Sequence, residues 1–157
     1  MATDPLDIDV ASSLVIERPL ADVSAFTLEP ANLPKWLKYA AAARWETSPP
    51  VRLGSLLRID RSARTGASSD VYEVCEYTPG EQVSWRTVDD NPLTMTFAWR
   101  SIGERVTHMT LRYRVRGTGR WTAAAARMVM RRSMSADLAR LRKALERDRP
   151  PRSDHVV

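Results

Sequence analysis

Length, composition and charge exclude several classes of protein. The chain has 157 residues, of which 43% are hydrophobic, which suits one domain with its own core and is too many for a disordered chain. Its single cysteine, Cys75, excludes an intramolecular disulfide, and no apolar run approaches the roughly 20 residues of a membrane span.

The net charge of +5 does not indicate a nucleic-acid-binding protein. The arginines are spread along the chain, and Arg112, Arg114 and Arg116 alternate with other residues, which places them on the solvent face of a strand. No nucleic-acid-binding module is present. Binding of the arginine-rich exterior to another protein or to an anionic membrane surface stays open as an alternative. The N-terminus lacks the basic and apolar regions of a signal peptide, so we expect a cytoplasmic protein.

Short elements separated by turn residues make up most of the chain. A first strand is predicted at residues 8–16. Two short helices follow, one with Pro19 in its first turn and ending near Thr27, the other with Asn32 as N-cap and Pro34 in its first turn. Six more strands are predicted at residues 42–48, 55–61, 70–77, 82–88, 93–101 and 106–116. Connections this short make the strands antiparallel neighbours in a meander.

Alternation in the later strands predicts which face is buried. In the strand at 93–101, four large apolar residues share one parity: Leu93, Met95, Phe97 and Trp99. In the last strand four residues do so: Met109, Leu111, Tyr113 and Val115. Val106 has the opposite parity, which predicts a β-bulge near Thr107 and His108.

A long helix is predicted at residues 121–147, which contain neither Gly nor Pro. Measured from Met134 at 100° per residue, six residues share its inward stripe: Ala123, Arg127, Met130, Leu138, Leu141 and Leu145. The leucines toward the C-terminus indicate a packed interface, whereas the smaller and flexible residues before them indicate a wall with space beside it. Residues 1–7 are expected to be an N-terminal extension, and residues 148–157 a flexible C-terminal tail.

This order of elements resembles the START/Bet-v-1-like (SRPBCC) superfamily, and within it the polyketide cyclase/dehydrase branch. The similar segments are VIERPLADVSAFTLEPANLPKW, VRLGSLLRI, YEVCEYTPGEQVSWRT, FAW, GERVTHMTLRY and MSADLARLRKALE. The likeness covers residues 8–147, which we take as a single domain. It implies an α+β helix-grip fold (β-α-α-β6-α), in which a curved seven-stranded antiparallel sheet, two short helices and a long C-terminal helix enclose a cavity for a small hydrophobic polyketide-, lipid- or aromatic-like molecule. Members of the superfamily include both enzymes and carriers, so the fold does not transfer a function.

The residues expected to contact the ligand are mostly aromatic or sulfur-containing: Trp36, Tyr72, Trp85, Phe97, Trp99, Tyr113, Arg127, Met130 and Met134. The alternative is that the aromatic residues fill a dry core. Trp36, in the second short helix, is expected to close one mouth of the cavity. Arg127 would bind an anionic ligand group; otherwise its head reaches solvent at the rim, or pairs with Glu76 or Asp60.

Catalysis is the alternative to binding alone. A polyketide cyclase, aromatase or dehydratase would use Arg127 to bind an enolate or carboxylate, with Tyr72, Tyr113 or His108 moving protons or holding the oxyanion. A strand histidine, however, is usually exposed, and a buried tyrosine usually bonds a neighbour. One cysteine and two distant histidines exclude zinc-type ligand spacing, and no phosphate loop or dinucleotide fingerprint is present, so we expect neither metal nor cofactor. Both a monomer and a homodimer fit the sequence.

Overall fold

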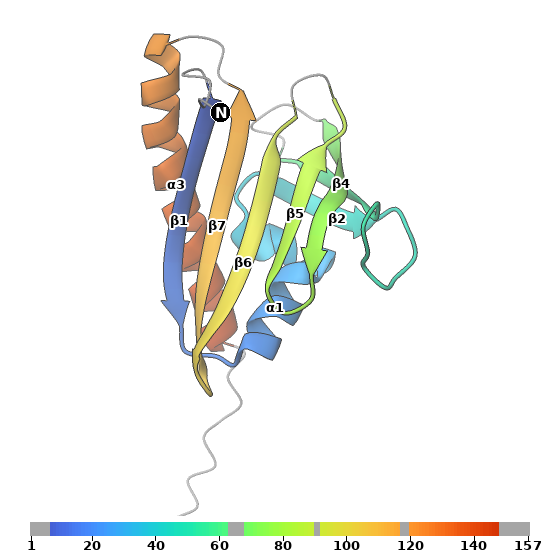
Figure 1. The fold of residues 1–157 in the computed structure, drawn as a ribbon, viewed down its shortest axis with the longest axis vertical. Coiled ribbons are helices and arrows are strands. Elements are labelled where there is room, and N and C mark those ends of the chain that lie inside the picture. Colours follow the sequence, from blue (N-terminus) through green and yellow to red (C-terminus); the bar gives the residue numbers. More distant parts are fainter. Residues whose placement is uncertain (1–6, 63–67, 90–91, 117–119, 148–157) are drawn as a thin grey trace, which may run out of the picture.

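The computed structural model describes residues 7–62, 68–89, 92–116 and 120–147. Seven strands form one antiparallel sheet in the order β1-β7-β6-β5-β4-β3-β2. The strands are β1 (Asp7–Ile16), β2 (Ala40–Trp45), β3 (Leu56–Arg61), β4 (Ser69–Thr78), β5 (Gln82–Thr87), β6 (Thr94–Gly103) and β7 (Val106–Arg116). The helices are α1 (Leu20–Leu28), η1 (Pro30–Asn32), α2 (Leu33–Trp36) and α3 (Arg120–Arg147). The predicted helix-grip fold is confirmed, with α3 running along one side of the sheet beside β1 and β7 (Figure 1).

In the segment between β1 and β2, prolines stand at the starts of the helices. Pro19 is the N-cap of α1, and Pro34 lies in the first turn of α2, where the missing N–H costs no intrahelical hydrogen bond. Asn32 holds the predicted N-cap position of α2, but its side chain caps nothing there and instead donates a 3.2 Å hydrogen bond to the Phe26 carbonyl. The two short helices are thereby joined to each other.

Strand β2 ends three residues before the predicted boundary. The backbone N–H of Leu56 donates to the side-chain hydroxyl of Thr47 at 3.1 Å instead of to a backbone carbonyl. A side chain has therefore taken the place of a ladder partner, and the pairing with β3 stops at Trp45.

The β-bulge predicted near Thr107 and His108 is wrong. Strand β7 pairs with β1 without interruption, and the irregularity of the β6–β7 pairing lies in β6, between Ser101 and Gly103. Thr107 takes the inward position, where it is fully buried and its hydroxyl donates a 2.8 Å hydrogen bond to the Arg18 carbonyl. Because a threonine with a satisfied hydroxyl can be buried, the change of parity that Val106 indicated does not exist.

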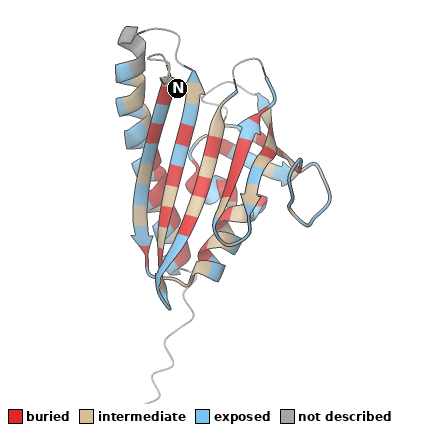
Figure 2. Ribbon diagram, in the orientation of Figure 1, coloured by how far each residue is buried: buried red, intermediate tan, exposed pale blue. Residues whose placement is uncertain are grey.

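Alternate residues of the central strands point into one core, as the bands of buried and exposed residues in Figure 2 show. Met95, Phe97 and Trp99 of β6 are buried, and so are Met109, Leu111 and Tyr113 of β7. From α3 the predicted stripe supplies Met134, Leu138, Leu141 and Leu145, each at most 2% exposed. The side chain of Ala123 and the tail at residues 148–157 lie outside the described residues, as do residues 1–6 of the N-terminal extension.

Candidate functional site

The interior between the sheet and α3 is closed at one end and looser at the other. Along the inward face of β7, Met109 and Leu111 have no exposed surface, Tyr113 is 8% exposed and Val115 is half-buried. Helix α3 follows the same gradient, from fully buried Leu141 and Met134 to half-buried Met130. The less tightly covered end is therefore formed by the last residues of β7 and the N-terminal half of α3.

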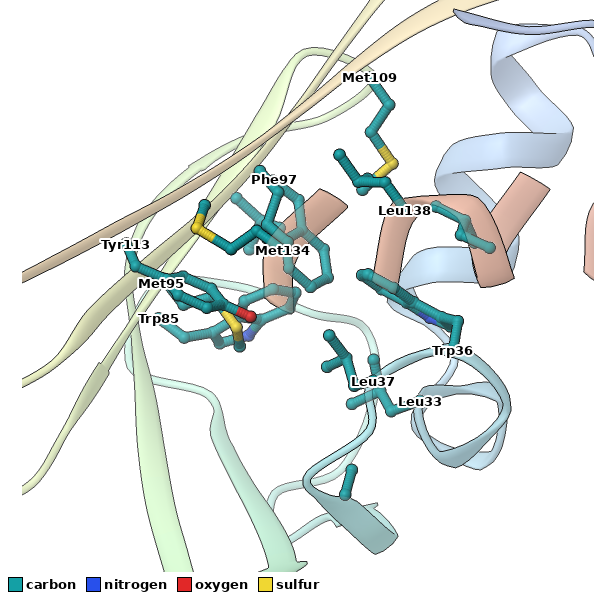
Figure 3. Close-up of a cluster of buried hydrophobic side chains, with 14 of the residues drawn as sticks. Leu33, Trp36, Leu37, Trp85, Met95, Phe97, Met109, Tyr113, Met134 and Leu138 are labelled. Carbon is teal, nitrogen blue, oxygen red and sulfur yellow. The ribbon is translucent and has the colours of Figure 1, made fainter. Parts of the chain in front are cut away.

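Three aromatic rings occupy the middle of this interior. Phe97 lies between Trp85, whose ring centroid is 4.5 Å away and nearly perpendicular, and Trp36, at 5.2 Å (Figure 3). Edge-to-face and tilted contacts of this kind are the favoured geometry for aromatic pairs. All three side chains are at most 1% exposed. Trp36 was expected to close one mouth of the cavity at the surface. Instead its side chain lies within the core.

Three buried hydrogen-bond donors in this interior have no partner in the described part of the chain: Trp36 Nε1, Trp85 Nε1 and the Tyr113 hydroxyl. Buried polar groups in folded proteins almost always have a partner, and each one left without it costs about 1–3 kcal/mol. In a purely apolar core, the indole N–H and the phenol hydroxyl would add only this cost. These three donors would therefore be free to bind an acceptor that reached the interior.

Two of the unpaired donors flank the same residue. The pairing of the strands places Trp85 of β5, Met95 of β6 and Tyr113 of β7 in one row across the sheet. The hydroxyl of Tyr39 donates to the sulfur of Met95 at 3.7 Å. Donors thus surround a methionine, whose flexible side chain can adjust to an incoming group.

The phenols of Tyr39, Tyr72 and Tyr113 are held in their neutral form. Burial raises the pKa of Tyr39, Tyr72 and Tyr113, and a hydrogen bond between Tyr39 and Tyr72 raises the pKa of the former while lowering that of the latter. At neutral pH these groups are consequently hydrogen-bond donors and not nucleophiles. Of the two predicted tyrosines, Tyr113 is the one without a partner, whereas Tyr72 interacts with Tyr39.

Asp137 is an interior residue that the sequence pattern missed. It is 2% exposed, and its Oδ1 accepts hydrogen bonds from the Lys38 backbone N–H, at 3.3 Å, and from Arg140. Burial, the largest cause, raises the pKa of its carboxyl above the usual range, although Lys38 and Arg140 act to lower it. Its charge in turn adds to the effect of burial in raising the pKa of Tyr113 and Tyr39.

Three of the predicted site residues lie away from these donors. The indole of Trp99 donates to Thr27 of α1 at 3.1 Å. Arg127 is half-buried and donates to the Asp7 carbonyl at 2.9 Å, at the start of β1, and not to Glu76 or Asp60. His108 has the outward parity of β7, opposite Arg100 of β6.

Two surface pockets are lined by described residues, and neither includes a residue predicted to contact the ligand. One lies between α1, α2 and α3, and the other where β1, β6 and β7 meet. Among the described residues, no three His, Cys, Asp or Glu side chains come together to bind a metal ion. No helix in the same residues is long and apolar enough to cross a membrane.

Comparison with known proteins identifies the family. Residues 7–146 match the sequence profile of a family described as "Polyketide cyclase / dehydrase and lipid transport". The chain belongs to this family. It is the polyketide cyclase/dehydrase family of the START (SRPBCC) superfamily, whose fold typically binds hydrophobic ligands. A search of curated proteins finds no match.

Several solved structures share the fold of this chain. A START superfamily protein from Mycobacterium smegmatis has a TM-score of 0.74 at 12% identity, covering 88% of this chain and 97% of its own. The ZhuI aromatase/cyclase from Streptomyces sp. R1128 has a TM-score of 0.71 at 12% identity, with 90% and 94% covered. The di-domain aromatase/cyclase StfQ of the steffimycin pathway has 0.72 at 14% identity, with 91% and 52% covered. At these identities the likeness shows the fold alone.

Proposed function

We propose that the protein binds a small, largely apolar molecule carrying a hydrogen-bond acceptor, in the interior between the sheet and α3. The observation that carries the proposal is the set of three buried donors without partners, at Trp36, Trp85 and Tyr113. A carbonyl or ether oxygen placed between Trp85 and Tyr113 would accept hydrogen bonds from both. The apolar part of the ligand would contact Phe97, Met130 and Met134, while Tyr72 would hold the hydroxyl of Tyr39.

The choice of side chains supports a ligand with a polar group over a purely hydrocarbon one. Tyrosine differs from phenylalanine only by its hydroxyl, so a core that bound only hydrocarbon would be more stable with phenylalanine at position 113. The same reasoning applies to the indole N–H of Trp85, which is 1% exposed. Both groups would lower the stability of the protein without ligand, and an acceptor that entered would give them a partner.

Space for the ligand would come from methionines. Met95 and Met134 have no exposed surface, and Met130 is half-buried at the looser end of the interior. Methionine has three rotatable bonds and repacks at little cost compared with a branched or aromatic residue. Entry past Met130 would thus displace flexible side chains, leaving the aromatic cluster around Phe97 in place.

A pair of matched probes tests this proposal. 2-Acetylnaphthalene and 2-ethylnaphthalene have similar shapes, but only the first has a carbonyl oxygen. We expect the ketone to raise the melting temperature of the protein clearly more than the hydrocarbon does, because only the ketone satisfies the buried donors. Tyr113→Phe should reduce this preference for the ketone. The control Tyr77→Phe, near the C-terminal end of β4, should keep it, because Tyr77 is not one of the buried unpaired donors. Equal shifts with both probes, or none with either, would contradict the proposal.

A second candidate function is supported by the buried carboxyl of Asp137, which accepts a hydrogen bond from the backbone N–H of Lys38, the residue before Tyr39. A carboxyl with a raised pKa can remove a proton next to a carbonyl, while a phenolic O–H donates a hydrogen bond to the enolate oxygen that forms. This is the chemistry that an aromatase or cyclase requires. Arg127 and His108 do not support it, because both lie away from these groups.

Proton exchange distinguishes catalysis from binding. With 1-(2-naphthyl)-1,3-butanedione in D2O, a catalytic interior would accelerate exchange of the C2 protons, followed by NMR, above the buffer rate. Asp137→Asn should abolish the acceleration and still allow the diketone to bind. Exchange at the buffer rate with bound diketone would eliminate the catalytic candidate and leave the binding proposal intact.

A further inference from the structure

A pocket of about 530 Å³ lies outside the sheet–helix interior, between α1, α2 and the C-terminal turns of α3. Figure 1 shows this end of α3 next to α1. Six described residues line the pocket: Phe26, Lys35, Arg140, Lys143, Ala144 and Arg147. Four of the six are cationic and none is acidic. Its lining thus differs in chemistry from the apolar interior described above.

Helical spacing places the cations of α3 on one face. Arg140, Ala144 and Arg147 follow one another at intervals of four and three residues, with Lys143 beside them, while Leu141 and Leu145 point into the core. Ala144 is small and leaves space between the two arginines. Ala144 therefore forms the base of the pocket, and the positively charged side chains lie around it.

The opposite wall comes from the short helices. The Lys35 ammonium lies over the Phe26 ring, 5.8 Å from its centroid, which is within the range of a cation–π interaction. Phe26 is half-buried against the core. One wall of the pocket thus offers an aromatic surface and a cation together.

Arg140 is held in place by the fold. Its Nε donates to the Trp36 carbonyl at 3.1 Å, and its Nη2 donates to Asp137. A guanidinium has five N–H donors, so others are left for a ligand. Among the described residues, Lys143 and Arg147 form no ion pair at all.

Stabilisation of the helix end does not account for the whole cluster. Cations in the last turn of a helix interact favourably with its dipole, which explains Arg147 and to a lesser degree Lys143. Lys35, however, belongs to α2, and Arg140 lies two turns before the end of α3. Like charges three and four residues apart repel one another, and of the three cations of α3 in the pocket only Arg140 forms an ion pair among the described residues, with Asp137.

We propose that this pocket binds the phosphate group of an organic phosphate monoester, with Phe26 contacting the organic part. A phosphate monoester carries about 1.5 to 2 negative charges at neutral pH and has three acceptor oxygens, a better match to four cations than a single carboxylate. Arginine binds phosphate through two parallel hydrogen bonds, and lysine adds a point charge. The source could be a soluble ester or a lipid headgroup, which share this chemistry.

Calorimetric titration with phenyl phosphate tests the proposal, with phenylacetate and inorganic sulfate as anion controls at equal ionic strength. The pocket variant is Lys143→Gln with Arg147→Gln. The matched control is Arg131→Gln with Arg132→Gln, two exposed arginines of the same helix outside the pocket. We expect the pocket variant to bind phenyl phosphate about tenfold or more weakly, and the control to bind within about twofold of the parent.

Flotation with phosphatidylcholine vesicles, with and without phosphatidic acid, separates the two sources. Binding to phosphatidic acid vesicles that the pocket variant alone loses assigns the phosphate to a lipid, and binding of phenyl phosphate without vesicle binding assigns it to a soluble ester. Equal weakening in both variants, phenylacetate binding as tightly as phenyl phosphate, or no binding of any phosphate probe would overturn the proposal. The interior ketone site is tested separately, since 2-acetylnaphthalene binding should be the same in both variants.

Discussion

The indole Nε1 of Trp99 lies 3.1 Å from the hydroxyl oxygen of Thr27, and both side chains are buried. The same hydroxyl donates to the Val23 carbonyl at 2.9 Å, so one side chain joins helix α1 to strand β6. Trp85 is as deeply buried, yet its indole N–H has no partner among the described residues. We therefore interpret Trp99 as a structural residue and Trp85 as a candidate ligand contact.

Replacement of Thr27 should therefore destabilise the fold. In Thr27→Val the shape is kept, but the Trp99 N–H loses its acceptor, and the free energy of unfolding should fall by about 1–3 kcal/mol. Thr27→Ser retains the hydroxyl and removes one methyl, for which about 0.8 kcal/mol is expected. Urea unfolding of both variants measures the difference. A valine variant at least as stable as the serine variant would show that the hydrogen bond contributes nothing.

Tyr113→Phe should behave in the opposite way. Its hydroxyl is buried without a partner in the described part of the chain, so its removal leaves no group unsatisfied. We expect the free energy of unfolding to stay unchanged or to rise by up to about 1–3 kcal/mol, the cost of a buried unpaired group. Urea unfolding without ligand is the measurement. A clear loss of stability would indicate that the phenol has a structural partner and is not held for a ligand.

The strand faces and the helix stripe could be predicted from the sequence because both follow from simple periodicity. What periodicity cannot supply is the partner of a polar side chain. Arg127 lies on the stripe as predicted, but its partner is the carbonyl of Asp7, 120 residues away in the chain. Trp99 likewise has the predicted inward parity, and only the placement of α1 decides that Thr27 accepts its hydrogen bond.

Asp137 was missed for a different reason. At 100° per residue it lies 60° from Met134, outside the 40° window that defined the stripe. A charged residue at the edge of an apolar stripe is ordinarily taken as solvated. Here Lys38 and Arg140 provide partners that allow it to be buried, and Lys38 belongs to a loop whose position the local pattern does not indicate.

The carboxyl of Asp137 should make stability depend on pH. Because burial raises its folded pKa above the unfolded value of 3.8, its contribution is fully present below that value and is lost as pH rises through the folded pKa. Asp137→Asn cannot ionise. The stability of this variant relative to the parent should thus increase between about pH 3 and about pH 7. Urea unfolding at several pH values gives the difference, and a constant or decreasing difference would contradict the raised pKa.

The ion pair of Asp9 and Arg112 should show the reverse dependence. The hydrogen bond from Arg112, 2.8 Å at Nε, is the main cause that lowers the pKa of Asp9. Its contribution is present above the unfolded value of 3.8 and is lost as pH falls through the lowered folded pKa. Both side chains are more than a third exposed, so Asp9→Asn should cost less than about 1 kcal/mol at neutral pH, and less in high salt. A larger, salt-independent loss would mean that the pair is not a surface interaction.

Replacing a side chain of α3 by alanine should have different effects at the two ends of the interior. Leu141 has no exposed surface at the closed end, so Leu141→Ala should lower the free energy of unfolding by about 2–5 kcal/mol. Met130 is half-buried at the looser end, so Met130→Ala removes fewer contacts and should cost clearly less. If ligands enter past Met130, the same truncation should also speed association of 2-acetylnaphthalene, measured by stopped-flow fluorescence, since a side chain no longer has to move aside. Unchanged association in Met130→Ala, with faster association in a Leu141 variant that still folds, would place the entrance at the opposite end.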